Sequence, residues 1–289
     1  KNIANDYIKK YKKKKISKDL ALRIYTTHLL GSEKKLVLHG GGNTSLKETQ
    51  KDIFNKMTNV MHVKGSGWDM SNLTEEGMPT VFLDPLIKTL KFQNMTDKNM
   101  VNFLRNNLLN SSSPNPSVET LLHAFLPHKY IDHTHSNAIL SLVNLENSNT
   151  ILKKIFGNKL AIVPYVMPGF DLAKICYQIY NKDKKVEGLL LLNHGIFTFA
   201  ATAEDSYNRM IKYVTIAENY IKKCKFKSKK INTINKKNNN FDIGKLQNHF
   251  RKIYYNNTKA KWIIKYNGTK NDILFSNLEN LKIIFSKGP

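Results

Sequence analysis

Residues 116–136, PSVETLLHAFLPHKYIDHTHS, are the stretch around which we expect the chain to be organised. They supply one carboxylate, Glu119, and two histidines one residue apart, His133 and His135. Side chains alternate between the faces of a strand, so a His-x-His pair on a strand places both imidazoles on the same face. Two such imidazoles can share a metal ion, but a closed site needs at least a third ligand.

A third histidine with the right setting lies far downstream. His194 stands in GLLLLNHGIFTFA, residues 188–200, which predicts two buried strands joined at Asn193-His194-Gly195. We therefore expect His133, His135 and His194 to bind one divalent ion, with Glu119 transferring a proton beside it.

Glu119 also has two structural interpretations that the sequence leaves open. Ser117 can cap a helix over residues 117–126, and a carboxylate in the first turn complements the helix dipole. His123 follows four residues later on the same helical face, so a simple side-chain pair is the second alternative.

Two glycine-rich segments are each predicted to follow a strand. The first, LVLHGGGNTSLKE at residues 36–48, predicts a strand over 36–38 and then a loop whose glycines let backbone N–H groups approach a ligand. The second, NVMHVKGSGWDM at residues 59–70, predicts a strand and an anion-binding loop with Lys64 as a point charge. Neither has the GxGxxG or GK[ST] spacing of nucleotide-binding loops. Each alone is equally compatible with a plain turn, whereas the two together favour a shared phosphate site.

The remaining pattern predicts one main domain. Helices are expected over residues 6–30, 96–109, 171–181 and 202–224, alternating with short strands. From Lys225 the composition becomes basic and polar. We expect residues 1–224 to form the main domain, and residues 225–289 to form a basic linker and the start of a following module.

Composition restricts the class of protein. Hydrophobic residues make up 41% of 289, enough for a core, and no apolar run approaches the ~20 residues of a membrane span. Two cysteines are too few for a disulfide framework, and no signal peptide is evident, so we expect a cytoplasmic protein. The net charge of +24 comes almost entirely from lysine, whereas bidentate phosphate contacts favour arginine. We therefore favour compositional drift over nucleic-acid binding.

Several motifs together resemble the class II aldolase/adducin family, most closely the aldolase part of bifunctional rhamnulose-1-phosphate aldolase/short-chain dehydrogenase proteins. They occur in the family's order over residues 20–224: LVLHGGGNTSLKE, HVKGSGWDM, PSVETLLHAFLP, YIDHTHSNAIL, VPYVMPGFDLA and LLLLNHGIFTFAATAEDSYNRM. The resemblance implies an α/β fold, a three-layer α/β/α sandwich around a mainly antiparallel central sheet, and homotetramers with sites at subunit contacts.

The resemblance also implies roles for individual residues. It implies a zinc ion, or another divalent ion, held by His133, His135 and His194, with Glu119 as the catalytic glutamate. The phosphate pocket falls on Gly42, Asn43, Ser66, Gly67 and Ser117. Val118 stands where relatives often have a second small hydroxyl residue, and the proton donor to the leaving aldehyde maps onto no position.

In the bifunctional relatives a dehydrogenase domain follows the aldolase. We expect the chain to end ahead of such a domain, with no NAD site within these residues. The expected reaction is zinc-dependent cleavage of a sugar phosphate, L-rhamnulose 1-phosphate to dihydroxyacetone phosphate and L-lactaldehyde. The alternatives are a sugar-phosphate 4-epimerase of the same family, whose members tend to carry aspartate at the position of Glu119, and a non-catalytic adducin-like binding protein.

Overall fold

The computed structural model describes residues 2–14, 16–52, 54–224 and 248–253. The chain divides into two units, Lys1–Cys224 and Lys225–Pro289. In the second unit the described residues, 248–253, are helical. The predicted basic linker at 225–240 lies outside the described residues, so the domain organisation stays a prediction. The fold below is that of the first unit.

The first unit is built on a seven-stranded sheet with the order β3-β2-β1-β4-β7-β6-β5. Neighbouring strands run antiparallel throughout, except β5 and β6, which are parallel. The strands are β1 (Asn43–Lys51), β2 (Met57–Val63), β3 (Thr80–Phe82), β4 (Tyr130–Thr134), β5 (Leu160–Val163), β6 (Gly188–Leu191) and β7 (Gly195–Ala200). The expected, mainly antiparallel sheet is confirmed.

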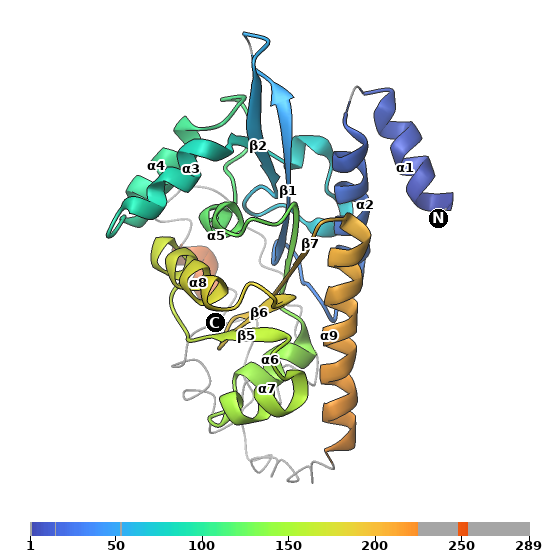
Figure 1. Cartoon of the computed structure of the whole chain (residues 1–289), viewed down its shortest axis with the longest axis vertical. Helices are drawn as coiled ribbons and strands as arrows, with labels where there is room; N and C mark the ends of the chain where they lie inside the picture. The colour runs from blue at the N-terminus through green and yellow to red at the C-terminus, as the bar shows by residue number, and fades with distance from the viewer. Residues whose placement is uncertain (1, 15, 53, 225–247, 254–289) are drawn as a thin grey trace. The chain divides into compact units, whose positions relative to one another are not determined.

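Helices cover both faces of this sheet (Figure 1). The α-helices are α1 (Asn2–Lys12), α2 (Lys18–Ser32), α3 (Leu83–Lys88), α4 (Asp97–Asn106), α5 (Thr120–Phe125), α6 (Asn137–Val143), α7 (Ser148–Phe156), α8 (Phe170–Lys182) and α9 (Ala203–Lys223). The described residues also form three 3-10 turns: η1 (Met70–Asn72), η2 (Glu75–Gly77) and η3 (Thr89–Lys91). Among the described residues, no helix has both the length and the apolar character needed to cross a bilayer.

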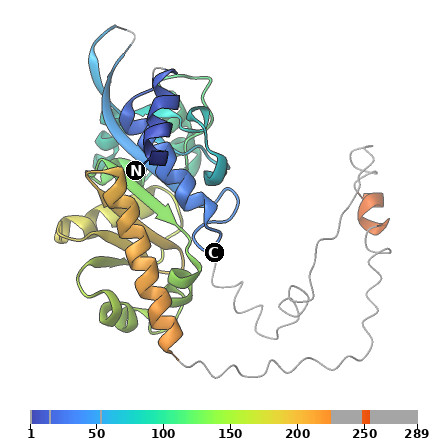
Figure 2. The same cartoon turned by 90° about the vertical axis from the view of Figure 1, so that its right-hand side faces the viewer.

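Strand alternation divides the core between the two faces. Leu189 and Leu191 of β6 join a cluster with residues of α3, α4, α5 and α8. Leu190, between them, joins a cluster with residues of α6, α7 and α9 on the opposite face. Helices α1 and α2 pack in a third cluster with Leu46 of β1 and Tyr130 of β4. The turned view in Figure 2 shows α9 as one long helix beside the sheet. The three-layer α/β/α architecture is therefore confirmed.

The prediction of one helix over residues 6–30 is wrong. The chain forms α1 and α2 instead, and the hydroxyl oxygen of Ser17 accepts a hydrogen bond from the backbone N–H of Leu20 at 3.0 Å to start α2. Gly31, expected to stop the helix, lies inside α2. A Cβ there would come within 2.3 Å of the backbone nitrogen of Ser71, so this glycine permits close packing against η1.

The strand predicted over residues 36–38 is also wrong, because that segment is a turn and the strand begins after the glycines. The backbone N–H groups of Leu36 and Val37 both donate to the carbonyl of Glu33, at 2.8 and 3.2 Å. Both side chains are buried, which explains the apolar signal. The first strand, β1, begins at Asn43.

Candidate active site

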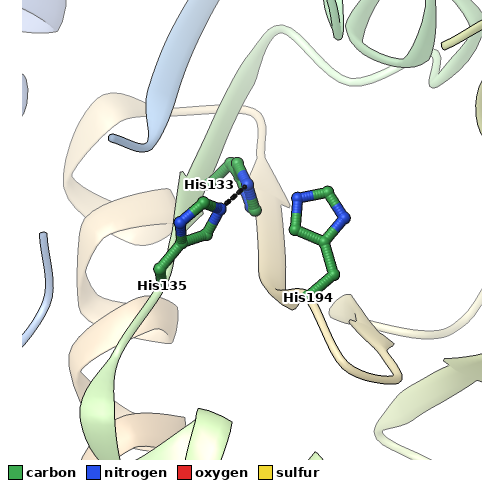
Figure 3. Close-up of side chains that lie close together, drawn as sticks. All are labelled: His133, His135 and His194. Carbon is green, nitrogen blue, oxygen red and sulfur yellow. Dashed lines mark hydrogen bonds between the residues drawn. The ribbon is translucent and has the colours of Figure 1, made fainter. Parts of the chain in front are cut away.

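Three imidazoles lie together at one end of the central strands (Figure 3). His133 is in β4, His135 follows the end of that strand, and His194 is in the turn between β6 and β7. The Nε2 atoms of His133 and His135 are 3.0 Å apart. The ring centroid of His194 lies 5.0 Å from that of His133 and 5.2 Å from that of His135. One nitrogen from each of the three rings lies within 4.8 Å of the other two.

The turn that carries His194 depends on a glycine and a left-handed residue. Asn193 has φ of 57°, a conformation that Asn tolerates better than most residues. A Cβ at Gly195 would come within 2.5 Å of the carbonyl oxygen of Thr134 and 3.1 Å of Cδ2 of His135. The predicted hinge at residues 193–195 is therefore confirmed, and it brings His194 against the end of β4.

The nearest neighbours of His133 hold its ring for ligation. Its Nδ1 lies 3.0 Å from the carbonyl oxygen of Ile196, which makes Nδ1 the protonated nitrogen and leaves the lone pair on Nε2. The ring stacks on Phe197 with centroids 4.0 Å apart. Burial is the main cause that lowers the pKa of His133 well below its ordinary value, and the neighbouring imidazoles act in the same direction. The ring is thus neutral, as a metal ligand must be.

Glu119 is placed directly beside the imidazoles. Its Oε1 lies 3.3 Å from Nε2 of His194, and its Oε2 lies 3.4 Å from Nε2 of His133. Burial raises the pKa of this carboxyl, although His194, Asn43 and Lys64 act in the opposite direction. A buried carboxyl with a raised pKa, next to a cluster of possible ligands, is suited to carrying a proton.

Neither structural alternative accounts for the Glu119 side chain. Glu119 is the N-cap residue of α5 rather than a first-turn residue, and its side chain makes no capping hydrogen bond. His123 does not pair with it either: its nitrogens face Ser45 and Asn43. The hydroxyl oxygen of Ser117 instead accepts from the N–H of Glu119 at 3.3 Å.

The side chains present fit a divalent ion. Oε1 of Glu119 and Nδ1 of His194 are both buried without a hydrogen-bond partner. The neutral imidazoles of His133 and His135 face each other through Nε2 at 3.0 Å. Because His133 holds its proton on Nδ1, the two rings present lone pairs to a common point. Three neutral imidazoles with room for further ligands are the donor set of catalytic zinc sites.

The residues expected to bind phosphate also converge beside Glu119. Gly65 pairs with Pro116 in an isolated antiparallel bridge, which sets Ser117 opposite Lys64 and Ser66 opposite Asn115. The two glycine loops touch, because a Cβ at Gly40 would lie 3.0 Å from the carbonyl oxygen of Gly67. Gly42 and Gly67 both have positive φ, 63° and 77°.

Lys64 is not the exposed point charge that the sequence predicted. Its ammonium group is buried and donates to the carbonyls of Gly40, Gly65 and Trp68, at 3.0, 3.3 and 2.6 Å. Burial lowers the pKa of Lys64 to about 8. Its contacts hold the two glycine loops together, because Gly40 belongs to the first loop and Gly65 and Trp68 belong to the second.

Asn43 also differs from the expectation that it serves phosphate. Its amide donates to Oε2 of Glu119 at 2.6 Å and to the hydroxyl oxygen of Ser117 at 3.1 Å. Its carbonyl oxygen lies 2.5 Å from Nε2 of His123. Sequence reasoning gave His123 no role in the site; its position four residues after Glu119 was the available signal.

Comparison with known proteins agrees with this geometry. The family model described as Class II Aldolase and Adducin N-terminal domain matches residues 22–221. The chain belongs to this family. The family-level resemblance inferred from the motifs is confirmed, whereas the closer resemblance to the rhamnulose-1-phosphate enzymes stays a prediction.

The relatives of this class II aldolase/adducin chain include a protein longer than it and a domain shorter than it. It is 39% identical over 198 residues to the uncharacterized oxidoreductase YuxG of Bacillus subtilis (strain 168), covering 68% of this chain and 29% of that protein. The N-terminal class II aldolase domain of a conserved protein from Thermoplasma acidophilum shares 40% identity, with a TM-score of 0.67 and coverage of 70% and 93%. A sugar-phosphate aldolase from Thermotoga maritima, at 15% identity and TM-score 0.53 over 70% and 93%, shares the fold.

Proposed function

We propose that this chain is a zinc-dependent aldolase that cleaves a ketose 1-phosphate, with L-rhamnulose 1-phosphate as the substrate that the family resemblance indicates. The products are dihydroxyacetone phosphate and L-lactaldehyde. The observation that carries the proposal is the buried carboxyl of Glu119, 3.3 Å from His194 and 3.4 Å from His133, in a group of three neutral imidazoles. A carboxyl beside a divalent-ion site is the arrangement that carbon–carbon cleavage next to a carbonyl needs.

The proposed roles follow from the position of each side chain. His133, His135 and His194 hold the ion, which when bound supplies Lewis-acid stabilisation of the negative charge developing on the substrate. The bond between C3 and C4 breaks with its electron pair on C3, while the C4 hydroxyl passes its proton to water and becomes the aldehyde. Glu119, in its acid form, delivers a proton to C3, a contribution of about 10²–10⁴-fold.

The two glycine loops serve the phosphate in this proposal. Gly42, Ser66, Gly67 and Ser117 lie on loops held together beside Glu119, with Ser66 and Gly67 exposed. Contacts to a phosphate remote from the breaking bond supply binding energy that orients the substrate. The amide of Asn43 is already committed to Glu119 and Ser117, so its side chain is not assigned to the phosphate.

The test is a panel of ketose 1-phosphates assayed for dihydroxyacetone phosphate with a coupled enzyme, before and after a chelator. We expect release that the chelator abolishes and that Zn²⁺ restores. A C4 epimer of the substrate in place of two fragments would support the epimerase instead. Purified protein that carries no divalent ion and cleaves nothing on the panel would support a non-catalytic binding role.

We further propose that the protein works in the cytoplasm as a homotetramer. The tetramer rests on the family resemblance and the location on the composition of the sequence, rather than on geometry within one subunit. Light scattering of the purified protein tests the oligomer, and a monomer at micromolar concentration with full activity would contradict it.

A further inference from the structure

A buried chain of hydrogen bonds leads from β1 to the carboxyl of Glu119. The hydroxyl of Ser45 lies 2.7 Å from Nδ1 of His123, and Nε2 of that ring lies 2.5 Å from Oδ1 of Asn43. The amide nitrogen of Asn43 then lies 2.6 Å from Oε2 of Glu119. All four residues are buried, with His123 and Ser45 at 0% exposure.

The amide of Asn43 gives this chain a direction. Its nitrogen, which only donates, lies against Oε2 of Glu119 and the hydroxyl oxygen of Ser117, so its carbonyl oxygen faces His123. Nε2 of His123 therefore carries the proton, and Nδ1 accepts from the hydroxyl of Ser45. Burial, with the cations of Lys47 and Arg23, lowers the pKa of His123 well below its ordinary value. A neutral ring has one donor and one acceptor nitrogen, as this chain requires.

The same direction separates the two oxygens of Glu119. Oε2 is held by the N–H donor of Asn43, whereas Oε1 has no hydrogen-bond partner and lies 3.3 Å from Nε2 of His194. Protonation of Oε2 would put a hydrogen against that N–H donor. Oε2, which also lies 3.4 Å from Nε2 of His133, is therefore the oxygen that Asn43 anchors.

We propose that His123 is a positioning residue: it fixes the amide of Asn43, which in turn holds the carboxyl of Glu119 in place through Oε2. The inference rests on the proposed function only for its effect on turnover. It assigns the Asn43 side chain to the carboxyl rather than to a phosphate, because both amide hydrogens are used, the second by Ser117 at 3.1 Å.

The first experiment reads the chain directly and needs no activity. In protein labelled with ¹⁵N-histidine, the ring nitrogens of His123 are assigned by their loss in His123→Gln. We expect a neutral ring protonated on Nε2, with Nδ1 unprotonated. A ring protonated on Nδ1, or on both nitrogens at neutral pH, would overturn the inference.

The second experiment separates positioning from structure. His123→Phe keeps a ring against Phe197, whose centroid lies 5.5 Å away, but removes the donor to Asn43. We expect kcat to fall about 10–100-fold, with KM and bound zinc changed less than about threefold. His123→Gln places an NH₂ group where Nε2 stands and is expected to recover most of that loss.

Matched variants complete the design. His128→Phe, at a half-buried histidine that also packs on an aromatic ring, is the control and is expected to leave kcat unaltered. Equal losses in His123→Phe and His123→Gln, or full kcat in His123→Phe, would overturn the inference. If His123→Phe fails to fold, the tautomer and the kcat of His123→Gln still decide. Wild-type protein that cleaves no ketose 1-phosphate refutes the proposed function, while the tautomer still decides the hydrogen-bond chain.

Discussion

Glu119 is buried among neutral imidazoles, and the energetic consequence is a carboxyl that holds its proton more tightly than a carboxyl in water. Its side chain satisfies no helix cap and pairs with no neighbour on α5. The contacts that hold the Glu119 carboxyl therefore come from outside α5, from Asn43, His133 and His194.

Replacing this carboxyl tests its role as proton carrier. We expect Glu119→Gln to lower kcat about 10²–10⁴-fold, because the amide has a similar shape but transfers no proton at neutral pH. Bound zinc, measured by elemental analysis, is expected to stay near the wild-type ratio since three histidines remain. Turnover within a few-fold of wild type would show that another group moves the proton.

Loss of a ligand tests the metal site independently of turnover. His194→Ala removes one of three converging nitrogens. We expect zinc affinity, measured by competition with a chelator, to fall by more than the roughly 10–100-fold typical of losing an outer partner. His39→Asn is a suitable control, since His39 is exposed and Asn tolerates its φ of 49°. Unaltered zinc affinity in His194→Ala would remove this residue from the site.

His128 predicts an acid-sensitive contribution to stability. Its ring stacks on Phe199 with centroids 4.2 Å apart, and burial, with Lys47 and Arg209, lowers its pKa to about 4. Between about pH 6.5 and pH 4 the unfolded chain binds a proton that the folded state does not, so stability falls as pH falls through this window.

The variant His128→Phe keeps the stacking and removes the titration. We expect the free energy of unfolding, measured by urea titration at pH 7.5 and pH 5.0, to drop less in the variant than in wild type. His39→Asn, lacking an exposed histidine, serves as the comparison and is expected to follow wild type. An equal drop in His128→Phe would show that His128 is not the group responsible.

At the scale of helices and turns, the close approach of two backbones explains why a glycine stands inside a helix, which the hydrophobic pattern of the sequence does not reveal. Helix α2 packs against η1 through Gly31, where a Cβ would come within 2.3 Å of the Ser71 nitrogen and 2.4 Å of the Met70 carbonyl carbon. Helical glycine ordinarily costs stability relative to alanine, so this glycine is retained for packing.

Gly31→Ala tests that contact. We expect the free energy of unfolding to fall by about 1–3 kcal/mol, because the backbone of η1 must shift to admit the methyl group. Ser32→Ala, at the next and exposed position of α2, is the control and is expected to alter stability by less than about 0.5 kcal/mol. A stabilised Gly31→Ala would show that α2 and η1 are not in close contact in solution.

The elements that the sequence predicted well are those with a strong local signal. Thr96 and Thr202, the first residues of two predicted helices, cap α4 and α9, each accepting from an N–H three residues on. The strands flanking Asn193 were predicted because apolar runs on both sides of a turn dipeptide have few alternatives. The prediction at residues 36–38 failed because Leu36 and Val37 are buried in a turn and not in a strand. The prediction at residues 6–30 failed because the apolar residues there belong to two helices, α1 and α2, and not to one.

At the scale of the whole molecule, we expect residues 1–224 to fold and to bind the metal ion without the rest of the chain. They form one of the two units into which the chain divides, and they contain the sheet and the three histidines. Residues 225–289 carry fifteen Lys or Arg against three Asp or Glu, half of the net charge of +24.

A chain ending at Cys224 tests that division. We expect it to unfold in one cooperative transition and to bind zinc with the affinity of the full chain, since no residue of the candidate site lies beyond that point. Because it loses half the net charge, it should elute from heparin at lower salt. Aggregation of the shortened chain, or lost zinc binding, would place part of the fold beyond residue 224.

The amino-acid sequence by itself determined the family, the α/β layers and the choice of candidate site residues, because strand alternation, caps and motif order are local properties of the chain. The tertiary structure alone decided how those residues are oriented. That Lys64 holds loop carbonyls, that Asn43 holds a carboxyl, and that His123 stands behind it depend on contacts between residues about 20 to 80 positions apart. Hydrogen-bond direction at such distances is set by which groups are buried together, and no local pattern records it.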